Sequence, residues 1–293
     1  TRILAPKAAS LGAVAPDQGR VGEVKAGGGR RRKSSNPAAG RRIAKRKSPE
    51  NGEITMRHEE IVAIVASPEF PSNVRDWGLH DSKGWSIAHE AAVQGKLPDG
   101  FTRWLIATNF DWTVAHVAAS LGRLPADFDQ WDVDDVDGWS VAHEAARCGH
   151  LPAGFDRWEL QDKEGRSVAH EAARHGRLPA DFDRWELAAE YGWTVAHEAA
   201  RFGTLPDGFT QWEIADDDGW TVAHEVSTWR KLPADFDRWD LATKDGWTVA
   251  HEAASYGHLP ADFDQWDLTD NAGRTVAQVL GLYVEDQKKS MKK

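Results

Sequence analysis

The residues of this sequence that could do chemistry are its repeated histidine–glutamate pairs, because imidazole and carboxylate groups bind metals and transfer protons. Histidine recurs every 27 residues, at His89, His116, His143, His170, His197, His224 and His251. Zinc-binding helices place two histidines four residues apart, whereas His170 and His175 are five apart. Histidines one period apart would lie about 8–10 Å apart on packed helices, too far to share a zinc ion with bonds of about 2 Å. We therefore expect structural histidines, with no metal site and no cofactor.

Other residue types give no stronger indication of catalysis. Cys148 is the sole cysteine and has no repeated His or Asp arrangement suited to a nucleophile, and a lone cysteine excludes an intrachain disulfide. No glycine-rich phosphate loop occurs within the repeats. Three pairs, Glu144–Arg147, Glu171–Arg174 and Glu198–Arg201, are predicted to face solvent, where each adds a few tenths of a kcal/mol. The sequence therefore predicts no catalytic residues, and an enzyme would need a pocket of titratable groups that the sequence does not reveal.

All these residues belong to a repeat of 27 residues. Tryptophan marks the same period, at Trp104, Trp131, Trp158, Trp185, Trp212, Trp239 and Trp266. Neither the histidine series nor the tryptophan series contains an insertion or a deletion. A fixed period of this length predicts a stacked array, in which each unit buries its apolar face against its neighbours.

Each unit contains the signals for two short helices. A Ser or Thr such as Thr194 precedes Val-Ala-His-Glu-Ala-Ala and is the predicted N-cap of a first helix, which a glycine nine residues later ends. Leu-Pro follows, and the next segment, such as 180–187, predicts a shorter second helix with Phe and Trp on one buried face. A turn with Asp three residues before Gly closes the unit, as at Asp162 and Asp216.

The pattern Asp-x-x-Gly-x-Ser/Thr-x-x-His-x-Ala-Ala-x-x-Gly, as in 162–176, resembles the ankyrin repeat, and the resemblance covers about 81–284. Two features depart from that family. Thr-Val-Ala-His replaces Thr-Pro-Leu-His, and the unit is about six residues shorter than the usual period of about 33, with the loss in the second helix. The resemblance implies an all-α, helix-turn-helix repeat solenoid in which each histidine ties its turn to the neighbouring unit. It also implies a non-enzymatic scaffold whose protein partners contact the turn tips and the face of the first helices.

The repeat boundaries divide the chain into five parts. We predict a disordered basic tail at 1–53, an N-terminal capping helix with a partial repeat at 54–80, seven ankyrin-like repeats at 81–268, a C-terminal cap at 269–286 and a disordered tail at 287–293. Trp77 keeps the period in the partial repeat, and Gln278 replaces the histidine in the C-terminal cap. Degenerate units at both ends are typical of stacked arrays, whose outer faces must meet solvent.

The charge is divided between a basic segment and acidic repeats. Residues 1–50 hold 13 Lys and Arg against three acids, a net charge of +10, in a chain whose total is −10. Two basic clusters, 30–33 and 41–47, resemble a bipartite nuclear-localisation signal; a solvated basic tail and an organellar transit peptide are alternatives. Residues 30–47 would also bind nucleic acid through phosphate contacts. Since neither a membrane-spanning run nor a secretory signal occurs, we expect an intracellular protein, cytoplasmic or, through the basic clusters, nuclear.

The positions at which the repeats differ are the candidates for partner binding, since stacking needs only the common residues. The position before the Ser/Thr cap holds Trp85, Trp112, Trp139, Arg166, Trp193, Trp220, Trp247 and Arg274. Trp and Arg are enriched at binding hot spots, although repetition in nearly every copy equally fits a structural role. The eighth position after the cap ends in three aromatic residues, Phe202, Trp229 and Tyr256. These three predict either a partner-binding stripe or packing between units.

Acidic residues supply a second hypothesis. Motifs such as DFDQWD at 127–132 and DFDRWD at 235–240 place Asp on the solvent side of each predicted second helix. A regular row of negative charge could imitate a nucleic-acid backbone, and it would also keep the array soluble and attract basic partners. The main prediction is a monomeric scaffold for an unidentified partner protein, and the alternative is an acidic decoy that occupies nucleic-acid-binding proteins.

Overall fold

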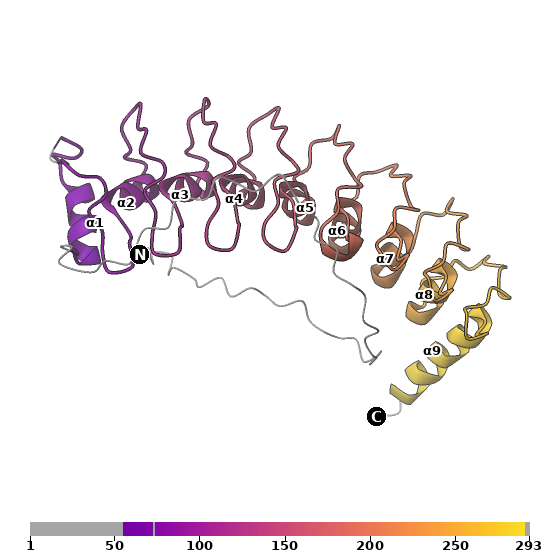
Figure 1. Ribbon diagram of the computed structural model, residues 1–293. Coiled ribbons are helices and arrows are strands. Elements are labelled where there is room, and N and C mark those ends of the chain that lie inside the picture. Colours follow the sequence, from indigo (N-terminus) through magenta and orange to yellow (C-terminus); the bar gives the residue numbers. More distant parts are fainter. Residues whose placement is uncertain (1–54, 73, 291–293) are drawn as a thin grey trace, which may run out of the picture. The chain divides into compact units, whose positions relative to one another are not determined.

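The computed structural model describes residues 55–72 and 74–290 as a row of single α-helices, one in each unit (Figure 1). The helices are α1 (His58–Ala66), α2 (Ile87–Gln94), α3 (Val114–Ser120), α4 (Val141–Cys148), α5 (Val168–Arg174), α6 (Val195–Phe202), α7 (Val222–Trp229), α8 (Val249–Tyr256) and α9 (Val276–Ser290), with a 3-10 turn η1 (Glu190–Gly192) before α6. Within the described residues each helix packs against the helices that precede and follow it in sequence. The predicted all-α repeat solenoid is therefore confirmed.

The helix of each unit begins and ends where the sequence places its signals. In the unit of α4, Ser140 has extended backbone and its Oγ accepts the N–H of His143. Gly149 ends α4 in the left-handed region, at a φ of 79°, where glycine carries no steric cost. Val141 and the alanines of the helix are fully buried or nearly so. These small side chains allow successive helices to approach closely.

The predicted second helix forms in none of the seven units. After Leu-Pro the chain makes two consecutive turns, closed in one unit by the N–H of Phe128 on the Pro125 carbonyl and the N–H of Val133 on the Gln130 carbonyl. In three units the second residue after the proline has a positive φ that an α-helix does not contain: Gly100, Gly154 and Gly208.

Phenylalanine and tryptophan rings replace that helix in closing the core of each unit. Each ring contacts the next edge to face, within a unit and across to the following unit, with ring centroids 5.0–5.9 Å apart. We call this series the aromatic ladder; its members are Phe70, Trp77, Phe101, Trp104, Phe128, Trp131, Phe155, Trp158, Phe182, Trp185, Phe209, Trp212, Phe236, Trp239, Phe263 and Trp266. Such contacts contribute about 0.5–1.5 kcal/mol each beyond the area they bury. Phe and Trp thus share a buried face as expected, but on turns instead of a helix.

The turns that precede the helices form another row of contacts between units. Oδ1 of Asp135 accepts the N–H groups of Asp137 and Trp139, so one carboxylate fixes the whole turn. The turn is then bonded to the unit before it, because the N–H of Val136 donates to the Phe110 carbonyl. Asp-x-x-Gly therefore sets both the turn and its distance from the neighbouring turn.

Gly192 lies at a close approach between two such turns, which gives a direct test of this arrangement. Its φ is 76°, and a Cβ there would lie 2.6 Å from the backbone nitrogen of Asp217 in the next unit. We expect Gly192→Ala to lower the free energy of unfolding by about 2–4 kcal/mol, since left-handed strain adds to a backbone clash. Gly208→Ala is the matched control, because its φ is 77° but a Cβ would meet nothing within 4 Å. A loss of about 1 kcal/mol is expected there, and equal losses in urea unfolding would contradict the close approach.

Atypical units close both ends of the array. At the N-terminal end, Ile61 and Val65 of α1 pack against Ile87 and Ala91 of α2. At the other end α9 packs against α8 and continues to Ser290.

Helix α9 reaches Ser290, past the predicted end of the C-terminal cap at 286. Residues 1–53, with the basic clusters 30–33 and 41–47, lie outside the described residues, as do 291–293. In the part of the chain that the structure describes, every helix is too short or too polar to cross a membrane.

Candidate partner-binding face

Each of the repeated histidines joins two units through its ring. In the unit of α4, Nδ1 of His143 accepts the N–H of Ser140 at 3.2 Å and lies 2.7 Å from the serine Oγ. Its Nε2 lies 3.1 Å from the carbonyl oxygen of Arg166 in the following unit. Since a carbonyl oxygen only accepts, Nε2 carries the proton and the ring is neutral. The same contact recurs, with Nε2 to oxygen distances of 2.8–3.0 Å, at His89, His116, His170, His197, His224 and His251.

Burial keeps six of these imidazoles uncharged at neutral pH by lowering their pKa values. It lowers the pKa of His116 and His143 from 6.5 to about 4, because an imidazolium without water is poorly solvated. Burial has the same effect, to a pKa of about 4, at His89, His170 and His224. The pKa of His197 is also lowered. Among the described residues, no group of three or more His, Cys, Asp or Glu side chains is placed to hold a metal ion.

The tryptophans before the caps are half-buried and lie against the histidine of their own unit, with ring centroids 4.7–5.0 Å apart. In five units the indole Nε1–H donates to the glutamate that follows the histidine, at 2.7–3.3 Å. These pairs are Trp85–Glu90, Trp139–Glu144, Trp193–Glu198, Trp220–Glu225 and Trp247–Glu252. Each indole thus packs within its unit while part of its surface remains exposed.

The glutamate after the histidine is buried in two of the three expected Glu–Arg pairs, at Glu144 and Glu171, and half-buried in the third, at Glu198, which corrects the expectation of exposed pairs along the helices. Glu144 is 1% exposed and accepts from Nε1 of Trp139 and Nε of Arg147. A helical wheel gives a side chain's direction from its own helix only. Here the preceding turn crosses that face of the helix and covers the carboxylate with an indole.

The other two arginines of the expected pairs lie over aromatic rings instead. The guanidinium of Arg174 is 4.8 Å from the ring centroid of Phe202 in the next unit. That of Arg201 is 5.6 Å from the Trp193 ring centroid, and its Nε is 3.8 Å from Oε1 of Glu225 in the following unit. The helix face is therefore linked from unit to unit by the contacts Arg174–Phe202 and Arg201–Glu225.

Arginine replaces tryptophan before two of the caps and keeps contact with its own turn. Nε of Arg166 donates to Oδ2 of Asp162 at 3.0 Å. Arg274 does the same to Asp270 at 2.7 Å, and its guanidinium also lies 5.1 Å from the Trp247 ring centroid. Both arginines are exposed at their outer ends, so this row of positions combines turn packing with accessible surface.

The three aromatic residues at the eighth position after the cap are exposed, although Phe202 also contacts Arg174 of the preceding unit. Phe202, Trp229 and Tyr256 are 43%, 55% and 47% exposed. We call them the aromatic stripe. They stand at the C-terminal ends of three successive helices, α6, α7 and α8. Nε1 of Trp229 donates to Oε1 of Glu225, the carboxylate that also accepts from Trp220.

The sequence matches no protein-family model, and no curated protein is similar to it. Among solved structures, the chain is similar to the crystal structure of the ankyrin repeat domain of Bcl-3, described as a unique member of the IkappaB protein family. That likeness has 19% identity and a TM-score of 0.38, and it covers 66% of this chain and 92% of the other. The geometry of the unit carries the assignment, with its carboxylate-closed turn, Ser/Thr-capped helix and histidine bonded to the following unit. The units are ankyrin-like repeats.

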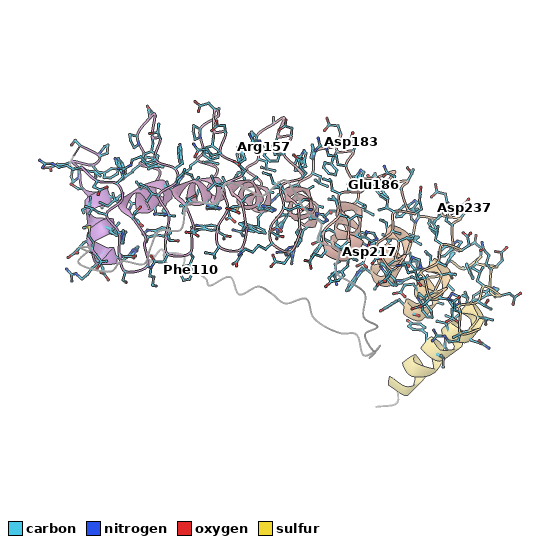
Figure 2. The ribbon with its side chains drawn as sticks, in the orientation of Figure 1. Phe110, Arg157, Asp183, Glu186, Asp217 and Asp237 are labelled. Atoms are coloured by element: carbon cyan, nitrogen blue, oxygen red, sulfur yellow. The ribbon has the colours of Figure 1, made fainter. Side chains whose placement is uncertain are left out.

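The sequence reasoning missed two exposed aromatic residues at the turn tips of the ankyrin-like array. Phe110 is 66% exposed and Tyr191 is 81% exposed. Figure 2 shows Phe110 on the same edge as Asp217, whereas Asp183 and Asp237 lie on the opposite edge. Both residues stand just before the turn position with positive φ, which is Asp111 after Phe110 and Gly192 after Tyr191. This position varies strongly from unit to unit, and comparing that column of the repeats would have revealed both residues.

The reasoning also missed a series of bonds in which one unit caps the helix of the unit before it. A side chain after the helix donates to a carbonyl near the end of the preceding helix, where positive groups are favourable. The donors and acceptors are Lys96 to Val65, Arg123 to Ala92, His150 to Ala119, Arg177 to Ala146, Thr204 to Ala173, Arg230 to Ala200 and His258 to Ser227. The varied chemistry of these donors hides the series from a search for a fixed motif.

Proposed function

We propose that the ankyrin-like array is a non-enzymatic scaffold that binds a partner protein through its turn tips and the face of its helices. The observation that carries this proposal is the aromatic stripe, Phe202, Trp229 and Tyr256, on three successive units. A large exposed aromatic side chain contributes little to folding, and several at equivalent positions mark an interaction surface. Aromatic residues also dominate binding hot spots.

Comparison with the other units supports the same reading. The stacking of units does not require aromatic residues at this position, because Gln94, Cys148 and His175 occupy it elsewhere. The fully buried histidines and alanines are common to the units, whereas the exposed positions differ. The aromatic stripe is therefore free to serve recognition.

The test is the triple variant Phe202→Ala/Trp229→Ala/Tyr256→Ala. We expect it to keep the far-ultraviolet circular dichroism and the unfolding midpoint of the parent within a few degrees, because the three side chains are exposed. Its affinity for a partner identified with the parent chain should fall at least 100-fold, since hot-spot aromatics contribute about 2 kcal/mol or more each. Gln94→Ala/Leu121→Ala/Cys148→Ala changes the same position in three earlier units and is the matched control. Equal affinity of parent and triple variant would refute the proposed surface.

A decoy function has one supporting observation, the exposed carboxylates of the loops that carry the aromatic ladder, such as Asp183 and Asp237 (Figure 2). Arginines interrupt this row by pairing with it across units, as in Arg184–Glu159 at 2.9 Å. A nucleic-acid backbone has no such interruptions, so the scaffold function has the stronger support. Competition between the array and duplex DNA for one DNA-binding protein would favour the decoy instead.

A further inference from the structure

We infer that the aromatic stripe, Phe202, Trp229 and Tyr256, receives a lysine- and arginine-rich segment of the partner protein. This inference rests on the proposed scaffold function and specifies the chemistry of the partner. A cation above an aromatic ring is attracted by the ring's quadrupole. A basic segment would place its cations over the exposed rings and against the carboxylates beside them.

The chain itself shows that its rings accept arginine. Arg174 lies over Phe202, with 4.8 Å from the guanidinium carbon to the ring centroid. Arg201 lies over Trp193 at 5.6 Å, and Arg274 lies over Trp247 at 5.1 Å. In two of these pairs, Arg174–Phe202 and Arg274–Trp247, the guanidinium comes from a different unit than the ring, so the stacked units already bring cations and rings together.

Among the described residues, the place from which Arg174 reaches Phe202 is occupied differently for the next two rings of the stripe. Phe202 is covered by Arg174, which stands one place before the stripe position of the preceding unit. The equivalent residue for Trp229 is Arg201, which is committed to Trp193 and lies beside Glu225. Trp229 therefore keeps 55% of its surface exposed. A partner's arginine or lysine over that indole would continue the arrangement that Arg174 begins.

For Tyr256 the equivalent residue is Thr228 rather than an arginine. Its hydroxyl donates to Oε1 of Glu252 at 2.8 Å. The last two rings of the stripe thus lie in units where the chain directs its own polar groups to glutamates.

The charge beside the stripe is complementary to a basic partner. The turn that precedes α7 carries Asp217 and Asp218, both exposed. This turn is joined to the stripe, because Trp220 in the turn and Trp229 at the end of α7 donate to the same carboxylate, that of Glu225. The turn before α8 adds the exposed Asp245 and also the exposed Lys244, whose Nζ donates to the Asp217 carbonyl, so carboxylates outnumber cations in these two turns. An acidic segment would meet these carboxylates, whereas a basic segment forms ion pairs with them.

The experiment is a selection of binders from a phage-displayed library of random 12-residue peptides on the immobilised full chain. Peptides that also bind Phe202→Ala/Trp229→Ala/Tyr256→Ala are removed. We expect the remaining peptides to be enriched in Arg and Lys. Neutral or acidic peptides that depend on the stripe would overturn the inferred chemistry and leave the scaffold function standing. A selection that yields no stripe-dependent peptide would overturn both.

A synthetic peptide from the selection then tests the contacts. Trp229→Leu should weaken its binding about tenfold, and Trp229→Phe, which keeps a ring, should weaken it less. Asp217→Asn/Asp218→Asn should weaken it several-fold in low salt and less at 0.5 M salt. Asp183→Asn/Asp237→Asn, on the opposite edge (Figure 2), is the matched control and should change affinity less than twofold. Equal effects of the two Asp pairs, or no effect of Trp229→Leu, would refute the claim that the peptide binds beside Trp229, Asp217 and Asp218.

Discussion

Acidification from pH 7 to pH 4 is expected to unfold the array, with most of the stability lost between about pH 6.5 and pH 4. Five inter-unit histidines have a pKa lowered by burial from 6.5 to about 4, among them His116 and His143. In this pH range the unfolded chain binds protons that the folded chain does not, so the free energy of unfolding falls as the pH falls. Each such histidine contributes about 3 kcal/mol. Together they contribute about 15 kcal/mol, the upper end of the net stability of about 5–15 kcal/mol usual for a folded domain.

Carboxyl groups with raised pKa values act in the opposite direction but are outnumbered. Burial raises the pKa of Asp135 to about 6, and it also raises the pKa values of Asp162 and Glu198. A carboxyl group with a raised folded pKa binds protons more readily in the folded chain, so it favours folding as the pH falls. The histidines therefore determine that the free energy of unfolding falls with falling pH. Urea unfolding at several pH values measures this net change.

The C-terminal cap supplies the matched variant for this prediction. Gln278 stands where the other units have histidine, and its Oε1 accepts the N–H of Thr275 as the imidazole Nδ1 does elsewhere. His143→Gln should keep the helix cap of α4 and lose the bond to the Arg166 carbonyl, at about 1–2 kcal/mol at pH 7. Because glutamine does not titrate, the loss of stability between pH 6.5 and pH 4 should become smaller. An unchanged pH dependence would show that His143 is not one of the titrating groups.

Trp158→Ala is expected to lower the free energy of unfolding by about 3–5 kcal/mol. Trp158 is 8% exposed, and its ring lies 5.2 Å from the Phe155 ring and 5.5 Å from the Phe182 ring of the next unit. Removing it opens a cavity and cuts the aromatic ladder in its middle. Since units of a stacked array stabilise only their neighbours, unfolding in urea should change from one transition to two.

Two further variants test whether the loss of stability comes from the place of Trp158 in the aromatic ladder or from the loss of any tryptophan. Trp229→Ala removes an exposed indole and should cost about 1 kcal/mol or less. Trp158→Phe keeps a ring and should retain a single transition with a smaller loss of stability. A loss from Trp158→Ala as small as that from Trp229→Ala would show that the ladder does not hold the units together.

The sequence alone determined the repeat, its period and the local signals of each unit. Caps such as Ser140 and terminators such as Gly149 act on the few residues beside them, so their effects can be read without knowledge of the fold. The repeat predicted a solenoid, because units of one length that each carry an apolar stripe can bury that stripe only against one another.

Tertiary structure decided what lies between the units. A segment of Leu-Pro, Phe and Trp has a helical pattern, yet its rings gain more from the rings of adjacent units than from a short helix of their own. A helical wheel considers the residues of a single helix and therefore predicted that Glu144 is exposed. Glu144 is buried because the indole of Trp139 reaches it from the preceding turn. The exposure of Trp229 also depends on where Arg201 of another unit is held. These outcomes depend on contacts between side chains of different units. The periodic pattern shows which residues occupy equivalent positions, but it does not show in which direction their side chains point.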